Sequence, residues 1–109
     1  MKYIFLVILG CLGTQVSAQL SVPQTGNNAY TVCSGTLYDS GGPSFNYSNN
    51  SDGYTVLNPS TAGNMVQVSG TSSGEDCCDY LRIYNGAGLG GNILWAGTLN
   101  IGTIPTITS

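Results

Sequence analysis

Glu75-Asp-Cys-Cys-Asp-Tyr-Leu-Arg-Ile-Tyr-Asn-Gly86 is the stretch of sequence that decides the fold. After Asp79 its residues alternate, so that Leu81 and Ile83 share one face of an extended segment and their neighbours share the other. This alternation predicts a half-buried β-strand. The pair Asn85-Gly86 tolerates left-handed backbone angles and predicts a turn directly after the strand.

The same stretch concentrates negative charge. It holds three of the five carboxylates of the chain, Glu75, Asp76 and Asp79, and the nearest basic side chain is Arg82. Such crowding favours a bound cation or open solvent. Calcium prefers about six to eight oxygen ligands, several of them carboxylates. Glu75 and Asp79 are therefore candidate metal ligands that begin a calcium site without completing it, and a solvated acidic loop is the alternative.

The first 18 residues have the pattern of a secretory signal peptide. Lys2 supplies the basic start, residues 3–12 the apolar core, and Val16-Ser17-Ala18 the small residues of a cleavage site. An apolar run of this length is too short for a bilayer, which needs roughly twenty residues. We expect a secreted protein without a membrane span. Lipidation at Cys11 is a second, less favoured possibility.

Residues 19–29 are polar and are predicted to be a leader or linker, and residues 30–109 are predicted to form one domain. With 16 glycines and only 6% charged residues, the composition favours a turn-rich β domain. Strands are expected in residues 30–38, 54–57, 64–70, 80–84 and 92–99, and from residue 106 onward. We therefore expect an all-β sandwich. Because an ending at Ser109 would leave an edge strand unpaired, we expect a fragment whose last strands are missing.

The charge and composition exclude several classes of function. Loss of Lys2 with the signal peptide would lower the side-chain net charge from −3 to −4. Binding of nucleic acid, or of anionic membrane surfaces, needs several basic residues and is not expected. The sequence contains no histidine, which excludes nucleophiles activated by a histidine base.

Four segments together resemble a CUB domain, especially those of secreted bacterial proteins. They are Cys33 to Tyr47, Asn58-Pro59, Glu75 to Gly86, and Pro105 to Ser109. The most specific part is Asp79-Tyr-Leu-Arg-Ile-Tyr-Asn-Gly86, which is similar to the family's Asp-Tyr-(Leu/Val)-x-Ile-x-x-Gly. The resemblance implies a jelly-roll-like antiparallel β-sandwich that recognises proteins or carbohydrates outside the cell.

The resemblance also implies a calcium site. In the calcium-binding members, an acid ahead of the strand and the aspartate that opens it are ligands, and these correspond to Glu75 and Asp79. A further aspartate of the family pattern would follow Ser109. A tyrosine that helps to order the site falls near Ser51 in this sequence, and the spacing from Glu75 to Asp79 is shorter than in typical animal members.

The cysteines do not follow the family's pairing. Without the signal peptide three remain, Cys33, Cys77 and Cys78, which is an odd number for an exported protein. The family's usual partners are replaced by Asn58 and by the Ala96-Gly97 region. Cys77 and Cys78 are candidates for a disulfide between adjacent residues, or one of them pairs with Cys33 or with a missing segment. A zinc site is disfavoured by the spacing.

The leading functional hypothesis is a non-catalytic extracellular recognition or adhesion module that binds a protein or a glycan, with calcium as the candidate ion. A structural spacer within a larger secreted protein is the alternative. A glycosidase using Glu75 and Asp79 is disfavoured, because two acids four residues apart on one short loop are poorly placed to flank a glycosidic bond.

Overall fold

The computed structural model describes residues 3–8, 18–74, 77–98, 100 and 102–109. These residues form β-strands and loops without an α-helix. In chain order the strands are β1 (Tyr3–Ile8), β2 (Ala18–Ser21), β3 (Asn27–Val32), β4 (Ser34–Tyr38), β5 (Tyr54–Pro59), β6 (Val66–Ser72), β7 (Tyr80–Tyr84), β8 (Ile93–Thr98) and β9 (Gly102–Thr108). The prediction of an all-β protein is confirmed.

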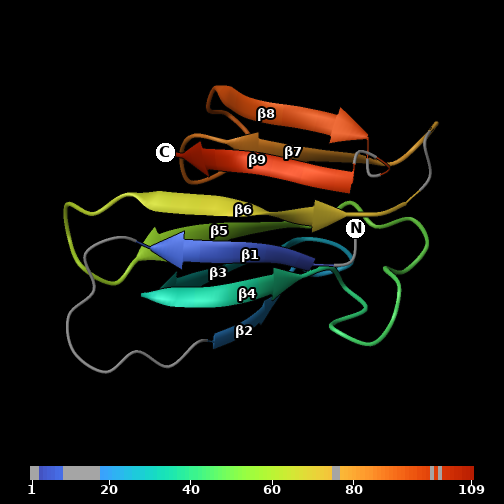
Figure 1. Cartoon of the computed structure of the whole chain (residues 1–109), viewed down its shortest axis with the longest axis horizontal. Helices are drawn as coiled ribbons and strands as arrows, with labels where there is room; N and C mark the ends of the chain where they lie inside the picture. The colour runs from blue at the N-terminus through green and yellow to red at the C-terminus, as the bar shows by residue number, and fades with distance from the viewer. Residues whose placement is uncertain (1–2, 9–17, 75–76, 99, 101) are drawn as a thin grey trace.

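The strands lie in two layers (Figure 1). The front layer is a five-stranded sheet in the order β2-β4-β1-β6-β9. Behind it lies the two-stranded sheet β3-β5, and a second two-stranded sheet, β7-β8, lies at its β9 edge with β7 behind β9. This arrangement is consistent with a β-sandwich whose rear layer is divided.

β1 is the central strand of the front layer. It runs antiparallel to β4 on one side and to β6 on the other. Ile4, for example, lies opposite both Leu37 of β4 and Gly70 of β6. Since β4 and β6 are both antiparallel to β1, they run parallel to each other.

The core lies between the two layers. Its buried apolar side chains each come from a different strand of the front sheet: Leu20, Leu37, Val68 and Ile104. Partly buried side chains of the rear layer pack against them, including Leu57 of β5 and Leu81 of β7. Burial of apolar surface between the layers is the main contribution to the stability of such a small domain.

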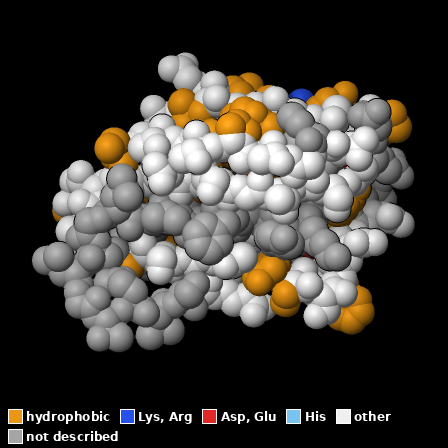
Figure 2. Space-filling view, in the orientation of Figure 1, with side chains coloured by type: hydrophobic (Ala, Val, Ile, Leu, Met, Phe, Trp, Pro, Cys, Tyr) orange, Lys and Arg blue, Asp and Glu red, His pale blue; other side chains and the backbone are white. Residues whose placement is uncertain are grey.

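The face drawn in Figure 2 is dominated by apolar and uncharged polar side chains, with very little basic or acidic colour. This agrees with the low content of charged residues in the sequence. No helix among the residues described here has the length and apolar character needed to cross a membrane.

The organising strand has the predicted form. In β7, Leu81 and Ile83 are partly buried while Tyr80 and Arg82 are exposed, as the alternation requires. Tyr84 departs from the pattern and is partly buried, because the β7–β8 register shifts between Ile83 and Tyr84. The turn after it is longer than a two-residue hairpin. The loop from Asn85 to Asn92 is closed by the Asn85 amide, which donates to the Asn92 carbonyl oxygen at 2.8 Å.

The first expected strand, residues 30–38, is two strands. The chain bends at Cys33 and crosses from β3 in the rear layer to β4 in the front layer. Residues on both sides of the bend have strand character, so the local sequence reads as one segment. The segment is divided because Val32 packs against the core from the rear layer, whereas Leu37 packs against it from the front layer.

The amino-terminal part also differs from expectation. Residues 19–29, predicted to be a linker, contain most of β2 and the start of β3. The reason is Leu20, which lies opposite Leu37 in the sheet and is only 3% exposed. β1 lies inside the predicted signal peptide. In addition, β2 pairs with β4 and β3 pairs with β5 in parallel, so the sandwich is not purely antiparallel.

Replacement of Ile104 should test the core. Ile104 is 2% exposed, and an alanine there leaves a cavity between the layers. We expect Ile104→Ala to lower the free energy of unfolding by about 2–5 kcal/mol, measured by urea denaturation. Ile93→Ala is the control, because Ile93 is 53% exposed and its loss should change stability by less than about 0.5 kcal/mol. Equal effects of the two substitutions would contradict this description of the core.

Candidate functional site

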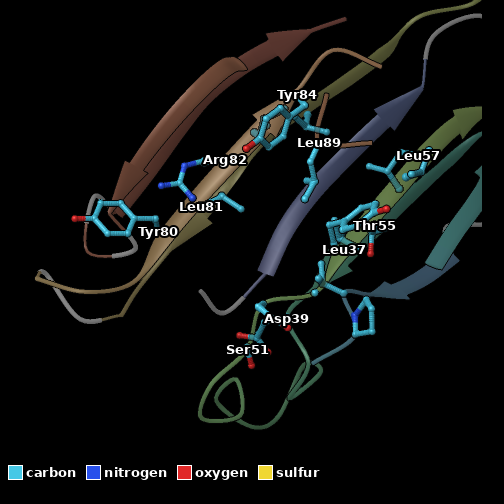
Figure 3. A pocket seen from close by; sticks show the side chains of 18 of the residues that line it. Leu37, Asp39, Ser51, Thr55, Leu57, Tyr80, Leu81, Arg82, Tyr84 and Leu89 are labelled. Atoms are coloured by element: carbon cyan, nitrogen blue, oxygen red, sulfur yellow. The ribbon is translucent and has the colours of Figure 1, made fainter. Parts of the chain in front are cut away.

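An open groove separates the two halves of the rear layer. It has a volume of about 1480 Å³ and is lined by residues of β5 on one side and of β7 on the other. Figure 3 shows Thr55 and Leu57 on the β5 side, and Leu81, whose side chain points toward β5, on the β7 side. The buried side chains Leu37 and Val68 of the front sheet also line it. The groove therefore reaches the core of the sandwich.

Three aspartates meet at one end of this groove. Asp39 directly follows β4, Asp52 shortly precedes β5, and Asp79 directly precedes β7. Because β4 runs opposite to β5 and β7, these strand ends lie at the same end of the sandwich (Figure 1). All three aspartates line the groove. We call this the acidic end.

Asp39 is the most unusual residue of the acidic end. Its side chain is only 3% exposed. One carboxylate oxygen, Oδ1, accepts a hydrogen bond from the Gly41 amide at 2.8 Å. The other, Oδ2, is buried and has no hydrogen-bond partner among the described residues. Burial raises the pKa of Asp39 above its ordinary value of 3.8, and the Gly41 hydrogen bond opposes that rise only in part.

The loop between β4 and β5 positions Asp39 through a set of serine contacts. The Ser48 amide donates to Ser40 Oγ at 3.1 Å, and Ser51 Oγ donates to the Ser48 carbonyl oxygen at 2.6 Å. Gly41 is required by close approach, since a Cβ at that position would collide with the carbonyl oxygen of Asn46. Ser51 Oγ lies 3.5 Å from Ser40 Oγ, next to Asp39 in the chain (Figure 3). The loop thus folds back on the residues that follow β4.

Tyr47 joins this loop to the start of β7. Its hydroxyl group donates a hydrogen bond to Oδ2 of Asp79. The two residues are 32 positions apart in the sequence. The contact holds one carboxylate oxygen of the predicted metal ligand in place.

The structure brings together only part of the predicted metal site. Asp79 opens β7 as expected, whereas Glu75 and Asp76 lie outside the described residues. Among the residues that are described, no three histidine, cysteine or acidic side chains are grouped closely enough to hold a metal ion. Calcium needs about six to eight oxygen ligands. The described donors around Asp79 do not by themselves supply such a set.

The two adjacent cysteines lie beside the acidic end. Cys77 and Cys78 form a disulfide with each other, which was one of the alternatives that the sequence left open. Cys78 also lines the groove. Cys33 is not a free thiol, and its Sγ lies 2.6 Å from Ser60 Oγ. The disulfide ties together the residues that lead into Asp79 and β7.

The β7 side of the groove carries the positive charge. The guanidinium group of Arg82 lies 5.4 Å from the centre of the Tyr80 ring, within the range of a cation–π contact. Both residues border the groove, and their side chains point away from β5 (Figure 3). Arg82 is the only basic side chain that the structure describes. Negative charge therefore predominates at the acidic end.

Sequence reasoning found Asp79 but missed Asp39 and Tyr47. Asp39 belongs to the Asp-Ser-Gly-Gly-Pro segment, which the sequence identifies only as a turn. The ordering tyrosine was expected near Ser51, whereas Tyr47 itself makes the contact with Asp79. A buried acid in a glycine-rich turn has no distinctive local pattern, so no sequence signal identified Asp39.

The buried carboxyl group predicts a pH dependence of stability. A carboxyl whose pKa is higher in the folded state binds more protons there than in the unfolded state. The free energy of unfolding should therefore fall as pH rises from about 3.8 through the raised pKa. An asparagine side chain cannot ionise, so in Asp39→Asn this decline should disappear and stability at pH 7 should exceed that of the wild type. Urea denaturation between pH 3 and 7 measures the difference, and parallel pH profiles of the two proteins would contradict the assignment.

No family model matches this chain, and no curated protein and no solved structure is significantly similar to it.

Proposed function

We propose that this chain is a non-catalytic extracellular recognition module that binds a protein or a glycan through the groove and its acidic end. The observation that carries the proposal is the acidic end itself. There a nearly fully buried carboxylate, Asp39, has an oxygen without a hydrogen-bond partner among the described residues, and it lines an open groove. Buried polar atoms are normally paired, so an unpaired one beside a groove favours a ligand that supplies the missing donor.

The surroundings of the groove support binding rather than catalysis. Two of the large exposed hydrophobic residues, Leu89 and Leu94, line it. Exposed apolar surface next to oriented polar groups is typical of interaction sites. The chain has no histidine to act as a general base. The proposed module is of the CUB type, with a jelly-roll-like sandwich and an extracellular location, as the sequence resemblance implies.

Binding to arrays of glycans and secreted proteins tests this proposal. The labelled chain should bind at least one ligand class, and Asp79→Asn should weaken that binding by roughly 5- to 30-fold, the range of a central interface residue. Met65→Ala is the matched control, because Met65 is 51% exposed and lies outside the groove. Binding that survives Asp79→Asn unchanged, or its absence from both arrays, would contradict the proposal.

Calcium dependence is a separate part of the proposal. Asp79 would contribute a carboxylate oxygen, and Glu75 is the partner that the resemblance implies. Titration calorimetry with calcium chloride should give a binding heat in the wild type that is lost in Glu75→Ala and in Asp79→Asn. Magnesium chloride is the control ion, because its smaller octahedral shell disfavours a site of this kind. The absence of heat in the wild type would reject calcium while leaving recognition by the groove intact.

A further inference from the structure

The front layer has a middle strand between two parallel strands, and the described part of the rear layer does not. In the front layer, β4 and β6 run parallel to each other, and β1 lies between them and pairs antiparallel with both. In the rear layer, β5 and β7 also run in the same direction (Figure 1). Among the described residues, β5 is hydrogen-bonded only to β3 and β7 only to β8. β5 and β7 are thus arranged like β4 and β6. Among the described residues, however, no strand lies between β5 and β7 as β1 lies between β4 and β6.

The inner edges of β5 and β7 are open edges of β-sheet. Such edges carry backbone donors and acceptors that readily pair with another extended chain. They border the groove, and between them lie the partly buried side chains Leu57, Leu81 and Ile83 and the buried Leu37 and Val68. A strand inserted there would gain two rows of backbone hydrogen bonds and an apolar contact on its inner face.

From this geometry we infer that the groove between β5 and β7 is an acceptor site for an extended peptide strand of a partner protein. This inference rests on the proposed function and names the class of ligand. The strand runs antiparallel to both neighbours and is five or six residues long, because β7 has five residues and β5 has six. Its inward side chains are apolar, and its main-chain groups supply most of the affinity.

The acidic end fixes the charge of this strand and where that charge lies. A strand antiparallel to β5 and β7 ends where those two strands begin, beside Asp52 and Asp79. Asp39, with its unpaired carboxylate oxygen, lines the same end. A lysine or arginine at the carboxyl end of the peptide therefore lies at the end of the groove that carries the three aspartates. The same residue at the amino end lies at the far end of the groove, away from all three.

Fluorescence anisotropy with labelled peptides tests the inference on the full chain. The first peptide is Thr-Val-Thr-Ile-Thr-Val-Lys-amide, with the label on its amino terminus. The second has the same composition with its first and last residues exchanged, Lys-Val-Thr-Ile-Thr-Val-Thr-amide, so that the lysine stays on the same face of the strand. The third is Thr-Val-Pro-Ile-Pro-Val-Lys-amide, in which the prolines remove two backbone donors. All three carry the same lysine charge, so a general attraction to an acidic protein does not distinguish them.

The first peptide should bind, the second should bind roughly three- to tenfold more weakly, and the third should not bind measurably. In Asp79→Asn, which retains the size of the side chain, the preference for the first peptide over the second should decrease. Hydrogen exchange should show slower exchange in β5 and β7 when the first peptide is bound. Protection confined to the outer edges β2, β8 or β9, equal binding of all three peptides, or no binding of the first peptide would overturn the inference.

The arrays described above separate this inference from the proposed function. If an array ligand binds while the first peptide neither binds nor competes with it, recognition stands and strand insertion is rejected. If neither the arrays nor the peptide show binding, both are rejected. If the peptide binds and displaces a protein ligand from the array, both are supported.

Discussion

The backbone pairing of β1 with β4 and β6 is the constraint on which the front sheet depends. Without a strand at that position, the sheet divides into β2-β4 and β6-β9. Leu37 and Val68, which help to close the core, come from the two strands that β1 joins.

The predicted signal peptide contains β1, so its removal would expose the inner edges of β4 and β6 together with part of the core. A processed chain can keep this architecture only if another strand takes that position. In both layers, two parallel strands face each other with edges whose backbone groups can be paired by an antiparallel strand between them.

The sequence predicts those parts of the fold that depend on local pattern. β7 follows from the alternation of Leu81 and Ile83, because which face of a strand is buried depends on adjacent residues. The bend at Cys33 has no such signal, since strand propensity continues across it and only the packing of two layers divides it. Leu20 is a similar case. A single apolar residue in a polar segment carries no periodicity, yet its position opposite Leu37 decides that the segment is a strand.

Of the three aspartates of the acidic end, the sequence predicted only Asp79 as a site residue, for the same reason. Asp79 is part of a motif that is continuous in the sequence. Tyr47 reaches it from 32 residues away, and the burial of Asp39 results from a loop that is closed by hydrogen bonds among its serines. These contacts are set by the folding of the β4–β5 loop over the strand ends. The types and spacing of neighbouring residues therefore do not predict the position of Tyr47 or the burial of Asp39.

Asp39 connects stability with function in this structure. Its burial favours the protonated form, and an oxygen without a partner among the described residues adds a desolvation cost to the folded state. A core residue selected for stability alone would not be a carboxylate at this position. A ligand that brings a basic group to the acidic end offsets this cost, because it supplies both the missing donor and the compensating charge. Among the residues that the structure describes, two sheet edges beside this groove also have no strand partner, and a bound strand would supply their hydrogen bonds. The unpaired carboxylate oxygen and two open sheet edges thus lie in one groove, as expected where stability is traded for binding.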